Sequence, residues 1–282
     1  MISSRVEVPN LGNRYKGLIL AAGEGRRISL DIPLPKALLE INGETLLMHN
    51  LKKLLAANIS EAVVAVGCKA AEVIRYSLEQ DLSISLRFVH QTERLGTAHA
   101  VKAAKDILED HPFILLYVDN FTDCGLESLL REHEERKNTA TVALFRAEEP
   151  KKHGIAETQG RSVLKIVEKP EDPVTNLAFA GMAVFEKEIF PVLEEVKPSP
   201  KGEYYLTDAI NILIRKGQKV GYTLLSGWRV NVNTLKEFRK AQRLAASPFP
   251  PGKDSKMKNR LEAGKTRDVT SGFVNSRWPL TS

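Results

Sequence analysis

The sequence has few cysteines and no long hydrophobic run. Its 282 residues include two cysteines, Cys68 and Cys124, which lie far apart and outside any CxxC pattern. This spacing excludes a disulfide-stabilised scaffold and a cysteine-rich zinc site. The longest uninterrupted apolar run covers six residues, 113–118, whereas a transmembrane helix needs about 20. We therefore expect no membrane partner.

Two further absences concern targeting and repeats. The first fifteen residues lack an apolar stretch and include Glu7, Pro9 and Arg14, so no secretory signal is expected and the predicted location is cytoplasmic. No internal repeat of about 20–50 residues is found. A composition of 43% hydrophobic and 27% charged residues instead indicates an ordinary globular protein that can bury a core.

Charge is distributed unevenly along the chain. The formal net charge is +6, and residues 247–282 hold seven basic against three acidic residues. Without apolar periodicity, this basic stretch is expected to be a disordered tail. A nucleic-acid-binding protein would instead gather basic and aromatic side chains on a folded face, so no nucleic-acid partner is expected. Residues 1–14 are expected to form a flexible lead-in, which leaves one domain over residues 15–246.

Strands and helices alternate in the first half of that domain. Predicted strands at 17–22, 61–66, 85–89 and 113–118 are followed by predicted helices at 47–55, 69–79, 100–108 and 125–136. The second half adds strand-like runs with short turns at 139–145, 155–158, 163–168, 178–185, 220–225 and 228–232, and helices at 206–215 and 234–245. The pattern predicts a three-layer α/β/α Rossmann-like domain with a mixed, mostly parallel sheet.

The segment after the first strand carries the clearest chemical signal. Residues 20–27 read LAAGEGRR, and a proline-rich stretch leads on to Lys36. Glycines directly after a buried strand let backbone N–H groups approach a phosphate. No Walker A Gly-Lys-Ser/Thr follows, and Ile28 stands where a dinucleotide-binding motif has its third glycine. The two cations Arg27 and Lys36 add a planar fork and a point charge, so the loop suits the binding of a triphosphate. The alternative interpretation of this segment is a turn that ends the strand and carries surface cations.

This loop, with the Pro-Lys pair downstream, resembles the signature of the sugar-phosphate nucleotidyltransferases, a family that includes glucose-1-phosphate thymidylyltransferases and uridylyltransferases. Further elements of that family follow in the same order over about residues 16–246. They are Gln91 with LGTA at 95–98, YVDN at 117–120, VEKP at 167–170, GEYYLTD at 202–208 and the segment 227–234. One such motif is a weak signal, but six in order are a specific one.

The resemblance implies attack of a sugar-1-phosphate oxygen on the α-phosphorus of a nucleoside triphosphate, which forms an NDP-sugar and releases pyrophosphate. The attacking phosphate is already an anion at neutral pH, because its second pKa is about 6, so no catalytic base is required. Bound Mg²⁺ and fixed cations would position the two polyanions. The implied partners are a sugar-1-phosphate and a nucleoside triphosphate. A glutamine such as Gln91 and a backbone loop such as 95–98 can present hydrogen-bond donors and acceptors to uracil or thymine, so dTTP or UTP is favoured.

The resemblance also assigns roles to individual residues. The expected catalytic cations are Arg27, Lys36 and Lys169. The expected nucleotide contacts are Ala21, Ala22, Gly23, Gly25, Gln91, Gly96 and Thr97. The expected sugar-phosphate contacts are Glu168, Lys169, Gly154 and Gly181, and the expected magnesium ligands are Asp119 and Asn231. For Glu168 a strand-ending ion pair is an equal alternative.

Three positions depart from the family pattern. Val118 stands where the family usually has glycine, Asn231 where many members have a second aspartate, and Phe179 where some have a polar sugar contact. Asn231 still offers an oxygen to Mg²⁺, and the branch acting on N-acetylglucosamine-1-phosphate is similar in using asparagine there. The missing charge predicts weaker metal binding, and Phe179 leaves the identity of the sugar open.

These departures keep two other functions open. One is a catalytically weak homologue that binds nucleotide sugars and acts as a regulatory subunit. The other is a cytidylyltransferase that acts on a non-sugar phosphate alcohol. A homo-oligomer, either a dimer or a tetramer, also stays open, whereas the missing hexapeptide repeat after residue 246 argues against an attached acyltransferase module.

Overall fold

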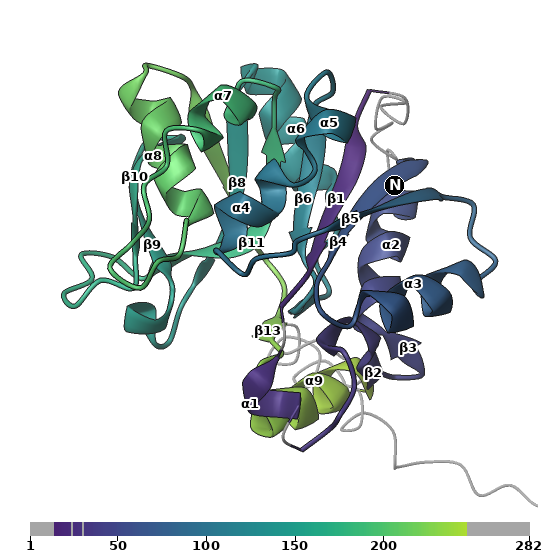
Figure 1. Ribbon diagram of the computed structural model, residues 1–282. Helices are drawn as coiled ribbons and strands as arrows, with labels where there is room; N and C mark the ends of the chain where they lie inside the picture. The colour runs from purple at the N-terminus through teal and green to yellow at the C-terminus, as the bar shows by residue number, and fades with distance from the viewer. Residues whose placement is uncertain (1–13, 24, 30, 247–282) are drawn as a thin grey trace, which may run out of the picture. The chain divides into compact units, whose positions relative to one another are not determined.

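The computed structural model describes residues 14–23, 25–29 and 31–246. Residues 1–13 of the expected lead-in and the expected basic tail at 247–282 lie outside the described residues. The described part runs from β1 to helix α9 (Figure 1). Within it, no helix is long and apolar enough to cross a membrane.

A nine-stranded mixed sheet forms the centre, in the order β5-β4-β1-β6-β11-β8-β12-β10-β9. The four parallel neighbours at one end are β5 (Ser85–His90), β4 (Glu61–Val66), β1 (Lys16–Ala21) and β6 (Phe113–Tyr117). The others are β11 (Leu177–Phe185), β8 (Ala140–Arg146), β12 (Val220–Leu224), β10 (Ser162–Glu168) and β9 (Gly154–Gln159). Strands β10 and β11 run antiparallel to their neighbours. The mixed sheet of an α/β fold is therefore present, as expected.

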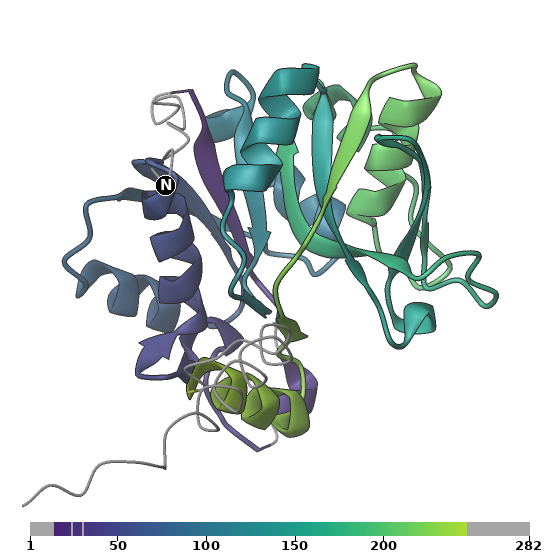
Figure 2. The same ribbon diagram turned by 180° about the vertical axis from the view of Figure 1, so that it is seen from behind.

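Side chains of the central strands alternate between two hydrophobic clusters. Leu18 and Leu115 belong to one cluster, and the adjacent Ile19 and Leu116 to the other. Both faces of these strands are buried, which explains their continuous apolar runs. The helices that pack into the Ile19 cluster include α2 (Leu46–Ala56), α3 (Ala70–Leu78) and α6 (Glu127–Arg136). Those in the Leu18 cluster are α4 (Thr97–Lys102), α5 (Lys105–Leu108), α7 (Ile189–Leu193) and α8 (Leu206–Arg215), as Figures 1 and 2 show from opposite sides.

The helix expected over residues 100–108 is two short helices, α4 and α5. The N–H of Ala104 donates to the carbonyl of Val101 at 3.0 Å. Such a bond to the third residue back tightens the turn and interrupts the α-helical hydrogen-bond pattern. The prediction of one continuous helix was therefore wrong at this point.

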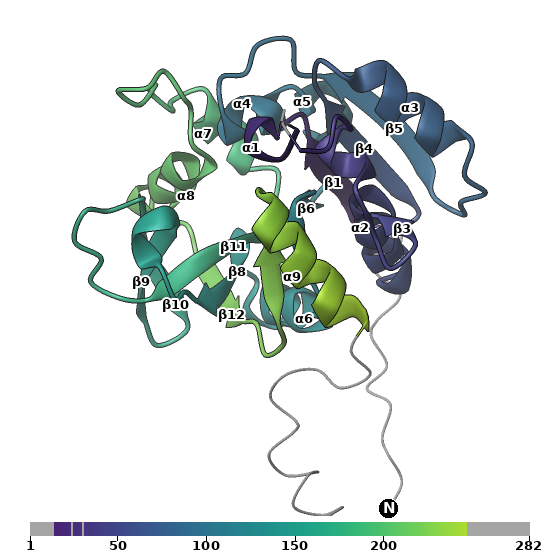
Figure 3. The same ribbon diagram turned by 90° about the horizontal axis from the view of Figure 1, so that it is seen from below.

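Several further elements gather at one edge of the main sheet. In Figure 1, α1 (Arg26–Ser29), α9 (Leu235–Ala246) and β13 (Arg229–Asn231) lie beyond the lower ends of the central strands, and Figure 3 shows α1 and α9 from that side. Strand β13 pairs with β7 (Asn120–Thr122) and does not join the main sheet. The remaining short elements are η1 (Lys36–Leu38), β2 (Glu40–Ile41), β3 (Glu44–Thr45) and η2 (Pro150–Lys152).

The strand order fixes where a ligand would bind. From β1 the sheet continues to β4 and β5 on one side, and β6 lies on the other side of β1. The segments that leave β1 and β6 diverge toward opposite sides, which creates a crevice at the carboxyl ends of these two strands. Ala22 and Gly23 follow β1, and residues 118–119 follow β6, so both segments border this crevice.

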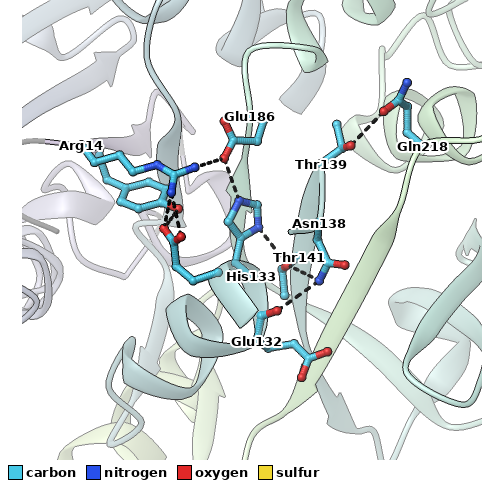
Figure 4. A network of polar contacts seen from close by, with 10 residues as sticks. Arg14, Glu132, His133, Asn138, Thr139, Thr141, Glu186 and Gln218 are labelled. Atoms are coloured by element: carbon cyan, nitrogen blue, oxygen red, sulfur yellow. Dashed lines mark hydrogen bonds and ion pairs between the residues drawn. The ribbon is translucent and has the colours of Figure 1, made fainter. Parts of the chain in front are cut away.

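A polar network lies at the opposite edge of the sheet (Figure 4). Arg14 pairs with Glu134 at 2.7 Å and with Glu186 at 2.8 Å. The buried ring of His133 contacts Thr141 Oγ1 at 2.9 Å and Glu186 Oε1 at 3.2 Å. Burial lowers the pKa of His133 below its ordinary value, although Glu186 opposes this effect. The ring is therefore neutral at neutral pH.

We expect the free energy of unfolding to fall as the pH drops below about 6.5, the ordinary pKa of histidine. The unfolded chain then binds a proton at His133 that the folded chain excludes until the pH reaches the lowered pKa. The loss is at most about 1.4 kcal/mol per pH unit for one histidine. His153, whose pKa burial also lowers, adds a loss of the same sign. Urea unfolding between about pH 5.5 and 7.5 should give a shallower dependence for His133→Gln than for the wild type. Equal slopes would show that folding does not change the pKa of His133.

Candidate active site

A cleft of about 510 Å³ opens at the crevice between β1 and β6. Its walls come from the segments after these two strands, from β13, from β9 and β10, and from the residues before α8. The predicted site residues that line it are Ala22, Gly23, Arg27, Lys36, Gln91, Gly96, Thr97, Asp119, Gly154, Glu168, Lys169, Gly181 and Asn231. Segments far apart in the chain thus border a single cavity.

The two predicted site residues outside this lining are Ala21 and Gly25. Ala21 is buried in the core at the end of β1. Gly25 has a φ of +63°, which favours glycine, and a Cβ at this position would lie 3.2 Å from Lys36 Cε. Glycine at position 25 therefore lets Lys36 pack closely against the loop.

Lys36 is the most constrained cation of the cleft. Its side chain is 9% exposed, and its Nζ lies 3.0 Å from Asp119 Oδ2. The Nζ also donates a hydrogen bond to Asn233 Oδ1, and the backbone N–H of Asn233 donates to Glu237 at 2.9 Å. Arg27, by contrast, is exposed and has no ion-pair or hydrogen-bond partner among the described residues. A fixed lysine and an unpaired arginine can hold a polyphosphate at two points.

Gln91 and the loop that follows it form one wall. Gln91 Nε2 donates to the carbonyl of Gly96 at 3.0 Å. Gly96 has a φ of +99°, and a Cβ there would lie 2.5 Å from the carbonyl oxygen of Tyr204. Tyr204 donates its N–H to the carbonyl of Leu95 at 2.6 Å and accepts from the N–H of Ala98 at 2.9 Å. The segment before α8 therefore holds this loop at two points and fixes its shape.

The opposite wall carries the predicted sugar-phosphate contacts. A Cβ on Gly154 would lie 3.0 Å from Glu168 Oε2, so glycine lets this carboxylate approach the backbone of β9. Glu168 Oε1 lies 3.5 Å from Lys169 Nζ, and burial raises the pKa of the Glu168 carboxyl despite this neighbour. Lys169 has a left-handed φ of +46° and donates its N–H to the carbonyl of His153 at 3.0 Å. Glu168 thus both forms an ion pair and borders the cleft.

The residues predicted as magnesium ligands fit a divalent cation. The pairing of β7 with β13 sets Asn231 opposite Asn120, which follows Asp119. Asn231 Oδ1 is buried and has no hydrogen-bond partner among the described residues. No cluster of three or more His, Cys, Asp or Glu side chains in the described part could hold a metal. One carboxylate and one amide oxygen nevertheless suit Mg²⁺, which commonly takes further ligands from water and substrate phosphates.

Comparison with known proteins identifies the family. The family described as nucleotidyl transferase matches residues 16–247. The chain belongs to this family. Its curated relatives include the UTP–glucose-1-phosphate uridylyltransferase AglF of Haloferax volcanii, 31% identical over 221 residues that cover 77% of this chain and 90% of AglF. The low-salt glycan biosynthesis nucleotidyltransferase Agl11 of the same organism is 32% identical over 233 residues, which cover 81% of this chain and 65% of Agl11.

Solved structures support the assignment of the fold. A UDP-glucose pyrophosphorylase complexed with UDP-glucose gives a TM-score of 0.74, with 82% of this chain and 97% of that chain covered. At 21% identity this likeness concerns the fold alone. The α/β nucleotidyl transferase fold and the family resemblance of the sequence motifs are therefore both confirmed.

Among the residues of the nucleotidyl transferase cleft that were not predicted as site residues, three carry unsatisfied buried polar atoms: Asn120, Thr207 and Arg229. Both amide atoms of Asn120, Oγ1 of Thr207 and Nε of Arg229 are buried without a hydrogen-bond partner among the described residues. Buried polar groups are nearly always satisfied in folded proteins, so this concentration of unsatisfied atoms indicates a polar ligand. Asn120 and Thr207 lie inside the motifs at 117–120 and 202–208. Arg229 lies inside the segment 227–234. Membership of these three elements was the available signal.

Two departures from the family pattern supply apolar surface to the cleft. Val118 is 4% exposed and belongs to the hydrophobic core while it also borders the cavity. Phe179 is 8% exposed, and its ring meets that of Tyr117 edge-on at 5.8 Å. Such surface suits the carbon-bound hydrogens of a sugar ring better than a phosphate.

Proposed function

We propose that the protein is a Mg²⁺-dependent sugar-1-phosphate nucleotidyltransferase that joins a sugar-1-phosphate to dTTP or UTP and releases pyrophosphate. One observation carries the proposal: a single cleft is bordered by Arg27, Lys36, Asp119 and Lys169, which come from four separate segments. Condensation of two phosphates requires cations and an oxygen ligand for metal around the same polyphosphate, because repulsion between the substrates is the main barrier.

The side chains act through position and charge. Arg27 and Lys36 hold the triphosphate on the side of the glycine loop, and Lys169 holds the sugar phosphate on the opposite wall. The attacking phosphate oxygen is anionic at neutral pH, so none of the cleft residues has to act as a base. Asp119 and Asn231 would hold Mg²⁺, which when bound would neutralise charge on the phosphates.

Lys36 links the metal site to the phosphate site. In the free protein its Nζ neutralises Asp119 at 3.0 Å. With a cation bound, Asp119 would no longer need Lys36 for neutralisation, and Nζ would be free to pair with a phosphate oxygen. Binding of the cation and binding of the triphosphate thereby favour each other.

The preference for a pyrimidine rests on the wall formed by Gln91. A glutamine side chain and backbone groups of the adjoining loop offer both hydrogen-bond donors and acceptors, which uracil or thymine needs. The name of AglF, a UTP–glucose-1-phosphate uridylyltransferase, supports UTP and glucose 1-phosphate as the first substrates to test. The two hydrophobic clusters of the sheet support a three-layer α/β/α transferase domain over residues 15–246. Cytoplasmic location and a homo-oligomer stay predictions.

A coupled pyrophosphate-release assay tests the function. We expect turnover with UTP or dTTP and a sugar-1-phosphate in the presence of Mg²⁺, and loss of turnover after chelation with EDTA that added Mg²⁺ reverses. Absence of turnover with every pair would contradict the proposal and favour the regulatory homologue. Turnover confined to CTP and a non-sugar phosphate alcohol would favour the cytidylyltransferase.

A further inference from the structure

Arg229 is a cation of the cleft that the proposed reaction leaves without a role. The centre of its guanidinium lies 4.1 Å from the centroid of the Phe145 ring, and its Nε is buried without a partner. No carboxylate of the described residues forms an ion pair with it. Burial lowers the pKa of Arg229 to about 10, despite the opposing effects of Asp119 and Glu237. It remains charged at neutral pH and lacks a neutralising partner.

The two nearest carboxylates are already engaged. Asp119 pairs with Lys36 at 3.0 Å. Glu237 accepts the backbone N–H of Asn233 at 2.9 Å and the hydroxyl of Thr234 at 3.0 Å. Arg229 is half-buried, and a partly desolvated charge without an ion-pair partner is costly in a folded protein. Because Arg229 borders the cleft, an anionic ligand in the cleft can supply that compensation.

Contacts of Phe145 place Arg229 on the side of the predicted sugar contacts. The Phe145 ring also meets the ring of His153 edge-on at 5.2 Å. The carbonyl of His153 accepts the N–H of Lys169 at 3.0 Å, and the next residue is Gly154, which lies against Glu168. The glycine loop with Arg27 belongs to another segment, which follows β1.

The guanidinium suits an anion with two neighbouring oxygens. Two parallel N–H groups of its planar fork match a carboxylate or a phosphate. The Nε of Arg229 is buried, so the pair of Nη groups is the edge that a ligand in the cleft can approach. The phosphates of both substrates already have predicted cations in Arg27, Lys36 and Lys169. A second anionic group on the sugar would have no other cation assigned to it.

We propose that Arg229 is a specificity residue that binds the carboxylate of a hexuronic acid 1-phosphate, so that the sugar substrate carries an acidic group besides its phosphate. This inference rests on the proposed nucleotidyltransferase function. Stacking on Phe145 fixes the guanidinium before the sugar binds, which reduces the entropy lost on binding.

Glucuronic acid 1-phosphate and glucose 1-phosphate test the inference, because they differ only at C6. We expect the wild type to give the higher kcat/KM with the uronic acid, using UTP or dTTP with Mg²⁺. In Arg229→Met the ratio of the two kcat/KM values should fall by about tenfold to a hundredfold, the range typical of a hydrogen bond to a charged group. Arg229→Lys, which keeps the charge but loses the planar edge, should show an intermediate ratio.

Lys152→Met is the matched control, because it removes another cation of the same cleft. Lys152 is paired with Glu149 at 2.7 Å and is largely exposed, so the ratio between the two sugars should not change. Both sugars are measured on one preparation, which makes the ratio independent of the folded fraction.

Equal losses with the two sugars would assign Arg229 to a phosphate and overturn the inference. Turnover with glucose 1-phosphate but no preference for the uronic acid would overturn it too, while leaving the proposed function intact. Turnover with no pair would overturn both.

Discussion

Lys36→Met should lower kcat by about 10²–10³-fold, the usual cost of removing one preorganised charge from a reacting group. It should also strengthen Mn²⁺ binding to the free protein. The Nζ of Lys36 lies 3.0 Å from Asp119 Oδ2 and therefore competes with a cation for this carboxylate. At an effective dielectric constant near 20, two unit charges about 4 Å apart repel by about 4 kcal/mol. Steady-state kinetics and a Mn²⁺ titration measure the two opposite effects.

Lys69→Met is the control for this variant. Lys69 Nζ donates to the carbonyl of Pro33 at 3.0 Å, so it supports the segment that leads to Lys36 but does not border the cleft. Its removal should leave kcat within a few-fold of the wild-type value, since exposed polar contacts contribute little. Wild-type turnover in Lys36→Met would show that Lys36 does not act on the phosphates. Weaker Mn²⁺ binding in this variant would show that Lys36 does not compete with the cation for Asp119.

Gly181→Ala should destabilise the fold by about 2–5 kcal/mol and raise the KM for the sugar-1-phosphate. Gly181 has a φ of +69°, and a Cβ there would lie 2.1 Å from Asn120 Nδ2 and 2.7 Å from the Tyr117 ring. A left-handed backbone costs a residue with a side chain about 1–2 kcal/mol, and overpacking adds about 1–3 kcal/mol. Asn120 and Tyr117 both line the cleft, so their displacement alters the sugar side of the site.

Gly160→Ala separates these two costs. Gly160 has a similar φ of +58°, but no atom lies within 4 Å of a Cβ at that position. This variant should lose only about 1–2 kcal/mol and keep its KM. Urea midpoints of the two variants give the difference, which measures the crowding at Gly181. Equal midpoints would mean that Asn120 moves aside without cost.

The position of the cleft was predictable because it depends on local patterns. Gly23 follows one buried apolar run, and Asp119 closely follows another. The carboxyl ends of parallel strands meet at one edge of a sheet, so these two residues were expected to converge. The family resemblance added distant residues such as Lys169, whose position in the cleft no periodic pattern reveals.

The β7–β13 ribbon and the surroundings of Arg229 were not predictable in the same way. Strands of three residues carry too little periodicity to be paired from sequence, yet this pairing sets Asn231 opposite Asn120. Arg229 lies inside the segment 227–234, but the sequence does not show what its side chain contacts. Its guanidinium packs on Phe145 in β8, a partner that only the folded chain brings near.

The backbone bonds of Tyr204 limit how the base preference could be re-engineered. The backbone of Tyr204 forms hydrogen bonds with Leu95 and Ala98 and leaves no room for a side chain on Gly96. The loop at 95–98 and the segment around Tyr204 therefore fit each other as a pair. A chimera that imports residues 91–98 from a relative with another base would also have to import the residues around Tyr204. Grafting either peptide alone would join two backbones that do not match.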